Sequence, residues 1–126
     1  MQKGPLNWKA NKRMKALGVD QNAKEAYELE KRAGFVKAGA DVIVTKSWLM
    51  YDSAFKSALF PLKEIESFYK TYTPTKYSGD FHVVFSFKDG GNYKIRSHFE
   101  ELDFIAAALA GRGVKQKRAQ HLGLFG

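Results

Sequence analysis

A serine, a histidine and three acids stand close together around residue 100, and these residue types could serve hydrolysis. Ser97 would be the nucleophile, His98 the base, and Glu100, Glu101 or Asp103 the carboxylate that orients the base. Spacing argues against this chemistry, because neighbouring residues at the start of a helix point in different directions. Acids in a first helical turn are also favoured by the helix dipole alone. We therefore expect a capped helix start here and no enzymatic activity.

Residues that could hold a metal or a cofactor are sparse. The three histidines, His82, His98 and His121, are spread too widely for the ligand spacing of a zinc site. The chain has no cysteine, so it offers neither a thiolate ligand nor a disulfide framework. We expect no catalytic, cofactor-binding or metal-binding residues. The absence of cysteine is typical of a reducing compartment and favours the cytoplasm.

The surplus positive charge lies at the two ends of the chain. Its 126 residues include 21 Lys and Arg against 13 Asp and Glu, which gives a net charge of +8. Residues 1–15 and 112–126 contain no acid, while the stretch between them is close to neutral. One interpretation is that both ends are simply solvated and bind nothing. If they bind, we expect contact with an anionic surface through eight residues: Lys9, Lys12, Arg13, Lys15, Arg112, Lys115, Lys117 and Arg118.

Two helical segments are predicted before residue 36. From Leu6 to Leu17 the apolar residues recur on one helical stripe and the lysines lie elsewhere, which predicts a basic amphipathic helix. In the second segment, Asn22 to Ala33, Asn22 and Glu25 resemble an N-cap pair. The apolar stripe of this second helix is thin. Because a thin stripe buries little area, we expect the second helix to lie outside the core.

Short runs of β-branched and aromatic residues begin at Val36 and predict strands. The predicted strands are residues 42–45, 47–51, 56–62, 68–72, 81–87 and 92–96. In Phe81–Phe87 alternate apolar residues share one face, and Asp89-Gly90-Gly91 after it is a hairpin signal. His82 falls on the opposite face, so we expect it to be half-exposed or covered by a neighbouring segment. Pro61 cannot donate to a ladder and should lie at a strand end or at a free edge.

A closing helix is predicted after the last strand. Ser97 stands three residues before Glu100 in a capping-box pattern, and the helix should stop near Gly111 or Gly113. Its apolar stripe is Leu102, Ile105, Ala106 and Leu109. The order of elements predicts an α+β, mostly β fold, in which a curved antiparallel sheet or roll is closed by this C-terminal helix. Residues 1–35 would form a lead-in with one or two N-terminal helices, 36–111 the domain, and 112–126 a basic C-terminal tail.

Two runs of the sequence resemble bacterial PH-like domains. Asp41–Tyr51 combines an apolar strand ending in Thr with a Trp-Leu start to the next strand, and Leu59–Tyr69 contains an apolar-Pro-Leu-x-x-Ile step. The likeness covers residues 36–110, and the lead-in is similar to that of an uncharacterised bacterial branch. The resemblance implies a PH superfold, a scaffold that hosts lipid-binding, peptide-binding and structural roles. The first hairpin loop offers only Lys46, which gives little support to a phosphoinositide pocket.

We expect a non-enzymatic PH-like interaction module that binds a protein or peptide partner, at a sheet edge or beside the closing helix. Tyr72 and Tyr77, which stand near a loop, are the expected docking residues. One alternative is peripheral association with an anionic membrane surface through the basic N-terminal helix. The other alternative is nucleic-acid binding, which the net charge favours but which no stacking motif accompanies.

Location and self-association are predicted from the ends of the chain. The amino terminus lacks the apolar stretch of a signal peptide, and the run Phe104–Ala110 is too short to cross a bilayer. We therefore expect a cytoplasmic protein, with the inner face of the membrane as the alternative. A homo-oligomer through the tail is a further hypothesis, because three apolar residues stand there: Leu122, Leu124 and Phe125.

Overall fold

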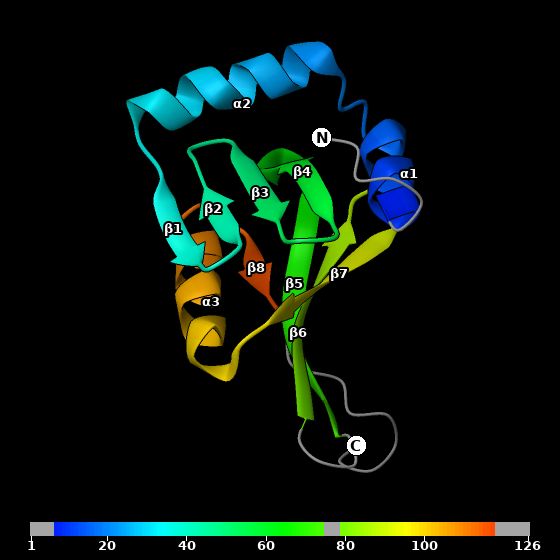
Figure 1. The fold of residues 1–126 in the computed structure, drawn as a ribbon, viewed down its shortest axis with the longest axis vertical. Helices are drawn as coiled ribbons and strands as arrows, with labels where there is room; N and C mark the ends of the chain where they lie inside the picture. The colour runs from blue at the N-terminus through cyan, green and yellow to red at the C-terminus, as the bar shows by residue number, and fades with distance from the viewer. Residues whose placement is uncertain (1–6, 75–78, 118–126) are drawn as a thin grey trace.

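Helices flank a series of strands in the computed structural model, which describes residues 7–74 and 79–117 (Figure 1). The helices are α1 (Trp8–Ala16), α2 (Gln21–Ala33) and α3 (Leu102–Ala110), with the short 3₁₀ helices η2 (Leu62–Glu64) and η3 (Phe99–Glu101). The strands are β1 (Val36–Gly39), β2 (Val42–Val44), β3 (Trp48–Asp52), β4 (Ser57–Pro61), β5 (Ile65–Pro74), β6 (Gly79–Phe87), β7 (Asn92–Ser97) and β8 (Lys115–Gln116). The predicted α+β, mostly β class is confirmed. Within the described residues, no helix is long and apolar enough to span a membrane.

The strands form two sheets rather than one continuous curved sheet. The first sheet has the order β1-β2-β3-β4 and the second the order β7-β6-β5-β8. Neighbouring strands are antiparallel except for β8, which runs parallel to β5. The chain passes from the first sheet to the second at η2, directly after Pro61. Pro61 ends β4 as predicted, because it has no N–H with which to continue a ladder.

The core lies between the two sheets. Phe60 of β4 brings its ring centroid to 4.9 Å from that of Phe87 and 5.3 Å from that of Tyr93, both in the second sheet. The ring centroid of Phe85, on β6, lies 6.5 Å from that of Phe60. Ile105 of α3 is fully buried in the same cluster. Both sheets and α3 therefore share one hydrophobic interior.

The predicted hairpin forms as β6 and β7. Val83, Phe85 and Phe87 are buried on one face of β6, while His82 lies half-buried on the other. The turn that follows contains Gly90 with φ of 90°, a conformation that a residue with a side chain adopts at a cost. The prediction from period-two alternation and the glycine turn is confirmed.

Helix α3 buries its predicted apolar stripe, but it does not begin with the predicted capping box. The buried residues are Leu102, Ile105, Ala106 and Leu109. Ser97 ends β7, and its hydroxyl donates to the carbonyl oxygen of His98 at 3.1 Å instead of capping a helix. Glu101 accepts a hydrogen bond from the backbone N–H of Ala40 at 2.9 Å. The turn before α3 is thus tied to the β1–β2 connection, and α3 starts only at Leu102.

Helix α1 covers the outer edge of β4. The side chain of Asn7 donates to the carbonyl oxygen of Ser57 at 3.0 Å and accepts from the Ser57 N–H at 2.9 Å, so it takes the place of a neighbouring strand. The sulfur of Met14 accepts from the N–H of Leu59 at 3.3 Å. Ala10 and Met14 are buried, which confirms the predicted amphipathic helix. The β4 edge of the first sheet is therefore closed to other strands.

Helix α2 lies outside the core, as its thin apolar stripe predicted, and Figure 1 shows it across one end of the molecule. Tyr27 is the buried residue of this helix. The predicted N-cap pair of Asn22 and Glu25 was wrong. The N-cap is Asp20, whose carboxylate accepts from the N–H of Ala23 at 2.9 Å. Asp is as good an N-cap as Asn, so the helix begins at the earlier of two equivalent signals.

The segment after α3 joins the second sheet. Lys115 and Gln116 form β8 beside Ser67 and Phe68, and the N–H of Lys117 donates to the carbonyl oxygen of Phe68 at 2.7 Å. Residues 112–117 therefore belong to the fold, although the sequence placed them in a tail. Four residues named in that tail lie outside the described residues: Arg118, Leu122, Leu124 and Phe125.

Candidate functional site

A groove of about 910 Å³ opens where several connections meet at one end of the two sheets. Its walls come from the α1–α2 connection, the β2–β3 loop, η2 with the start of β5, and the segment after α3. We call it the basic groove, because six basic side chains line it: Lys46, Lys63, Lys88, Arg112, Lys115 and Lys117. Glu66 is the one acid among the lining residues that the structure describes. The lining therefore carries a large excess of positive charge.

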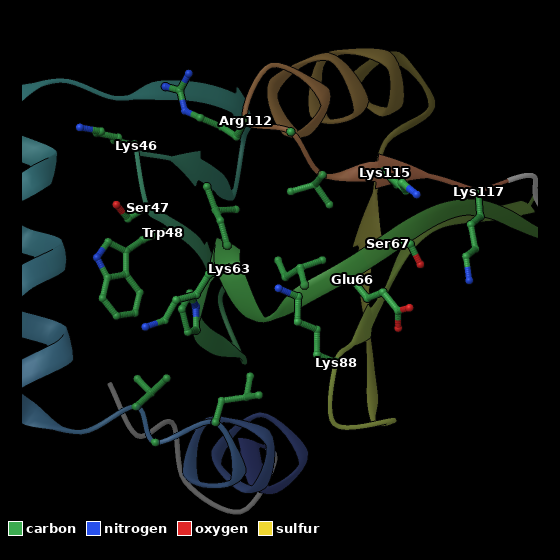
Figure 2. A pocket seen from close by; sticks show the side chains of 18 residues that line it. Lys46, Ser47, Trp48, Lys63, Glu66, Ser67, Lys88, Arg112, Lys115 and Lys117 are labelled. Atoms are coloured by element: carbon green, nitrogen blue, oxygen red, sulfur yellow. The ribbon is translucent and has the colours of Figure 1, made fainter.

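The charges are spread along the basic groove. Figure 2 shows Lys46 and Arg112 at one end, Lys63 and Lys88 in the middle, and Lys117 at the other end. All six basic residues are exposed, so each keeps a hydrated charge and adds to the positive potential of the groove. A row of separate cations suits a ligand that carries several negative charges in succession.

The floor of the basic groove is apolar. Leu62, Ile65 and Val114 line it, and each is at least nine-tenths buried. Trp48 adds a half-buried indole at the end near the β2–β3 loop (Figure 2). The buried hydroxyl of Ser67 has no hydrogen-bond partner within the described residues. A ligand with both apolar and negatively charged groups would match this lining.

The β2–β3 loop of the groove is held from two sides. One carboxylate oxygen of Glu30, on α2, accepts from the hydroxyl of Thr45 at 2.6 Å and from the backbone N–H of Ser47. From the other side, Nε of Arg112 donates to the carbonyl oxygen of Thr45 at 3.1 Å. Within the loop, the N–H of Thr45 donates to the carbonyl oxygen of Trp48 at 2.9 Å. Helix α2 therefore positions the groove even though it contributes little to the core.

We expect Glu30→Gln to destabilise the protein at neutral pH but not in acid. Burial raises the pKa of Glu30, but hydrogen bonds from Thr45 and Ser47 together with the Lys46 charge outweigh it and set the pKa below its ordinary value of 4.5. Because the folded-state pKa is depressed, the ionised carboxylate stabilises the fold above the unfolded pKa, and this contribution is lost as pH falls through the folded pKa. In urea unfolding, the free energy of unfolding of Glu30→Gln should be lower than that of the unchanged protein at neutral pH. This difference should disappear below about pH 4.

The control for this prediction is Glu28→Gln, which removes an exposed carboxylate from the same helix. It should leave the urea midpoint nearly unchanged across the same pH range. A gap for Glu30→Gln that stays constant into acid would contradict a role for the ionised carboxylate.

The sequence-predicted basic residues divide between two places. Three of them line the basic groove: Arg112, Lys115 and Lys117. Three others lie exposed on α1: Lys9, Lys12 and Lys15. Arg13 differs from its neighbours, because its guanidinium forms an ion pair with Asp89 and lies 5.0 Å from the ring centroid of Phe87. Arg13 therefore ties α1 to the β6–β7 turn and is not one of the exposed cations of the helix.

The predicted docking tyrosines lie away from the basic groove. Tyr72 is 45% exposed near the end of β5, whereas the groove lies at the start of that strand. Its ring centroid is 4.8 Å from that of Phe81, which is 5.2 Å from that of Phe99. Tyr77 lies outside the described residues. His82, on the outer face of β6, is half-buried as predicted, and burial is the main cause that lowers its pKa.

The residues first considered for hydrolysis hold other partners. The Ser97 hydroxyl donates to the backbone of His98, whose side chain is exposed. Glu101 binds a backbone N–H of the β1–β2 connection, and Asp103 forms an ion pair with Lys70 at 3.2 Å. Over residues 7–74 and 79–117, no group of three or more histidine and acidic side chains could hold a metal ion.

Sequence reasoning did not assemble the basic groove, although a signal for it was present. Lys46, Lys63 and Lys88 each follow directly after a predicted strand. Strands β2 and β4 run in the same direction in the first sheet. In the second sheet β6 runs antiparallel to β5, which begins just after β4, so all three lysines line the same groove. Basic residues at the ends of alternate strands could therefore have indicated this site.

No protein-family model matches this chain, and a search of the curated proteins found no significant match.

Proposed function

We propose that this chain is a PH-like binding module whose basic groove holds an acidic segment of a partner protein. The observation that carries the proposal is the lining of the groove, in which six basic side chains stand against one acid within the described residues. The apolar floor favours a segment that also has apolar side chains between the acidic ones, because these can be buried against it.

The PH-like part of the proposal has separate support. It rests on the resemblance of Asp41–Tyr51 and Leu59–Tyr69, and on the order of two sheets followed by a helix. In this proposal α3 closes one end of the sheets, where it packs against β1, β2 and β6.

An acidic peptide suits the groove better than the other anionic ligands. A single phosphate group would need converging cations, whereas these cations are spread from Lys46 to Lys117 (Figure 2). A nucleic acid would need rings on which successive bases can stack, and among the described lining residues Trp48 is the one aromatic side chain. Attraction between exposed charges is screened by salt, so the association should be reversible and weaken as salt rises.

The test uses Trp48 as the reporter. The chain has two tryptophans, so Trp8→Phe leaves Trp48 alone in the groove. We expect its emission to change saturably when the variant is titrated with a tryptophan-free peptide that alternates Glu with apolar residues. Lys46→Glu, Lys63→Glu and Lys115→Glu should each weaken this binding by roughly five-fold, the effect of about 1 kcal/mol.

The matched controls are Lys37→Glu and Lys94→Glu, which change the net charge equally but lie on β1 and β7, outside the groove. Both should bind the peptide nearly as well as the unchanged protein. Equal weakening by groove and control variants would show a general charge effect and overturn the proposal. So would tight binding of an oligonucleotide by a protein that ignores the acidic peptide.

A further inference from the structure

Helix α1 presents a face that nothing in the described fold covers. Trp8 is 59% exposed, and Lys9, Lys12 and Lys15 around it are exposed as well. Residues 8, 12 and 15 follow the spacing of one helical face, and α1 contains no acid. We call Trp8, Lys9, Lys12 and Lys15 the outer face of α1. The ammonium of Lys9 lies 5.8 Å from the Trp8 ring centroid, so the indole and the charges form one continuous surface.

The outer face of α1 cannot rotate into the protein. On the opposite side of the helix, Asn7 binds the backbone of Ser57 and Met14 contacts β4. Arg13 fixes a third point through its ion pair with Asp89. The helix is thus held at its start by Asn7 and in its second half by Arg13 and Met14, and Trp8 faces outward. More than half of the Trp8 side chain is therefore exposed to water, and the contact that it has on this face is with the Lys9 ammonium.

We propose that the outer face of α1 lies on an anionic lipid bilayer. Indole rings favour the headgroup region of a membrane, where one part of the ring meets hydrocarbon and the N–H meets water. Lysines beside the ring meet the negative lipid phosphates, so the charge of the face complements that of the surface. This site is distinct from the basic groove and does not depend on the function proposed for it.

A short helix with one aromatic anchor gives weak, reversible association rather than stable insertion. The basic groove lies beside the α1–α2 connection, so a protein held in this way would present its groove near the membrane. A lipid surface suits this face because an indole stands among exposed lysines on a helix without acids.

The experiment isolates Trp8 with the variant Trp48→Phe. Vesicles of phosphatidylcholine mixed with phosphatidylglycerol should shift its emission to the blue, and pure phosphatidylcholine vesicles should not. Each lysine at an anionic leaflet contributes roughly a five-fold change in partitioning, so replacing Lys9, Lys12 and Lys15 together by Gln should weaken it on the order of 100-fold. The matched control replaces three lysines elsewhere by Gln, namely Lys24, Lys37 and Lys94, and should retain most of the binding.

The two tryptophans also separate this inference from the function proposed above. Anionic vesicles should shift the emission of Trp8 in Trp48→Phe and leave the emission of Trp48 unchanged in Trp8→Phe. The acidic peptide should change the emission of Trp48 and leave that of Trp8 unchanged. Partitioning into uncharged vesicles, equal loss in both triple variants, or a vesicle response confined to Trp48 would each overturn the lipid contact of α1.

Discussion

Phe60→Ala should lower the free energy of unfolding by about 3–5 kcal/mol. Phe60 is fully buried, and its ring packs edge-on against Phe87 and Tyr93 across the space between the two sheets. Truncation removes both the transfer of the ring from water and the aromatic contacts, and it leaves a cavity that both sheets line. Urea unfolding followed by tryptophan emission and by far-ultraviolet circular dichroism measures the loss.

The control is Phe55→Ala, five residues earlier in the connection before β4. Phe55 is 68% exposed, so the same chemical change should shift the free energy of unfolding by less than about 0.5 kcal/mol. If Phe60→Ala were as mild as Phe55→Ala, the two sheets could not share the interior in which Phe60 meets Phe85 and Phe87.

Elements fixed by neighbouring residues were predicted from the sequence. The alternation of Val83, Phe85 and Phe87 and the turn at Gly90 define β6 and β7 within a single stretch of chain. The stripe of α3 is similarly local, because residues three and four apart lie on one face of a helix. In both cases the residues that form the sequence pattern are the same residues that form the helix or the strands.

Features that join distant segments were not predicted. Arg13 and Asp89 pair across 76 residues. In the second sheet, Lys115 of β8 pairs with Ser67 of β5, which lies 48 residues earlier. Neither pairing follows from hydrophobic periodicity, which specifies the face of an element but not its neighbour. The division into two sheets was missed for the same reason, since each strand carries the same alternation in either arrangement.

The basic groove combines both cases. Arg112 and Lys115 were named as anionic contacts because the end of the chain is basic, but a free tail was expected there. Their place beside Lys63 depends on the pairing of β8 with β5 and on the change of sheet at η2. A charge count thus identified some of the residues, and the topology decided where they meet.

Leu109→Ala should lower the free energy of unfolding by about 2–5 kcal/mol and should also weaken binding at the basic groove. Leu109 is fully buried at the end of α3, and its carbonyl oxygen accepts from the N–H of Arg112 at 3.0 Å and of Val114 at 3.1 Å. Loss of its side chain loosens the point from which residues 112–117 reach the second sheet. The same change should therefore reduce both the urea midpoint and the affinity for the alternating Glu peptide.

Leu29→Ala is the matched control, because it makes the same substitution in a helix at a side chain that is 64% exposed. It should shift stability by less than about 0.5 kcal/mol and leave peptide binding intact. A loss for Leu109→Ala no larger than this would contradict the burial of the apolar stripe of α3 in the core. Peptide affinity can be measured under conditions in which Leu109→Ala is less stable but still folded. If the affinity were then unchanged, α3 would have no influence on binding at the groove. Because Arg112 and Lys115 reach the groove only through the end of this helix, we expect stability and binding to fall together.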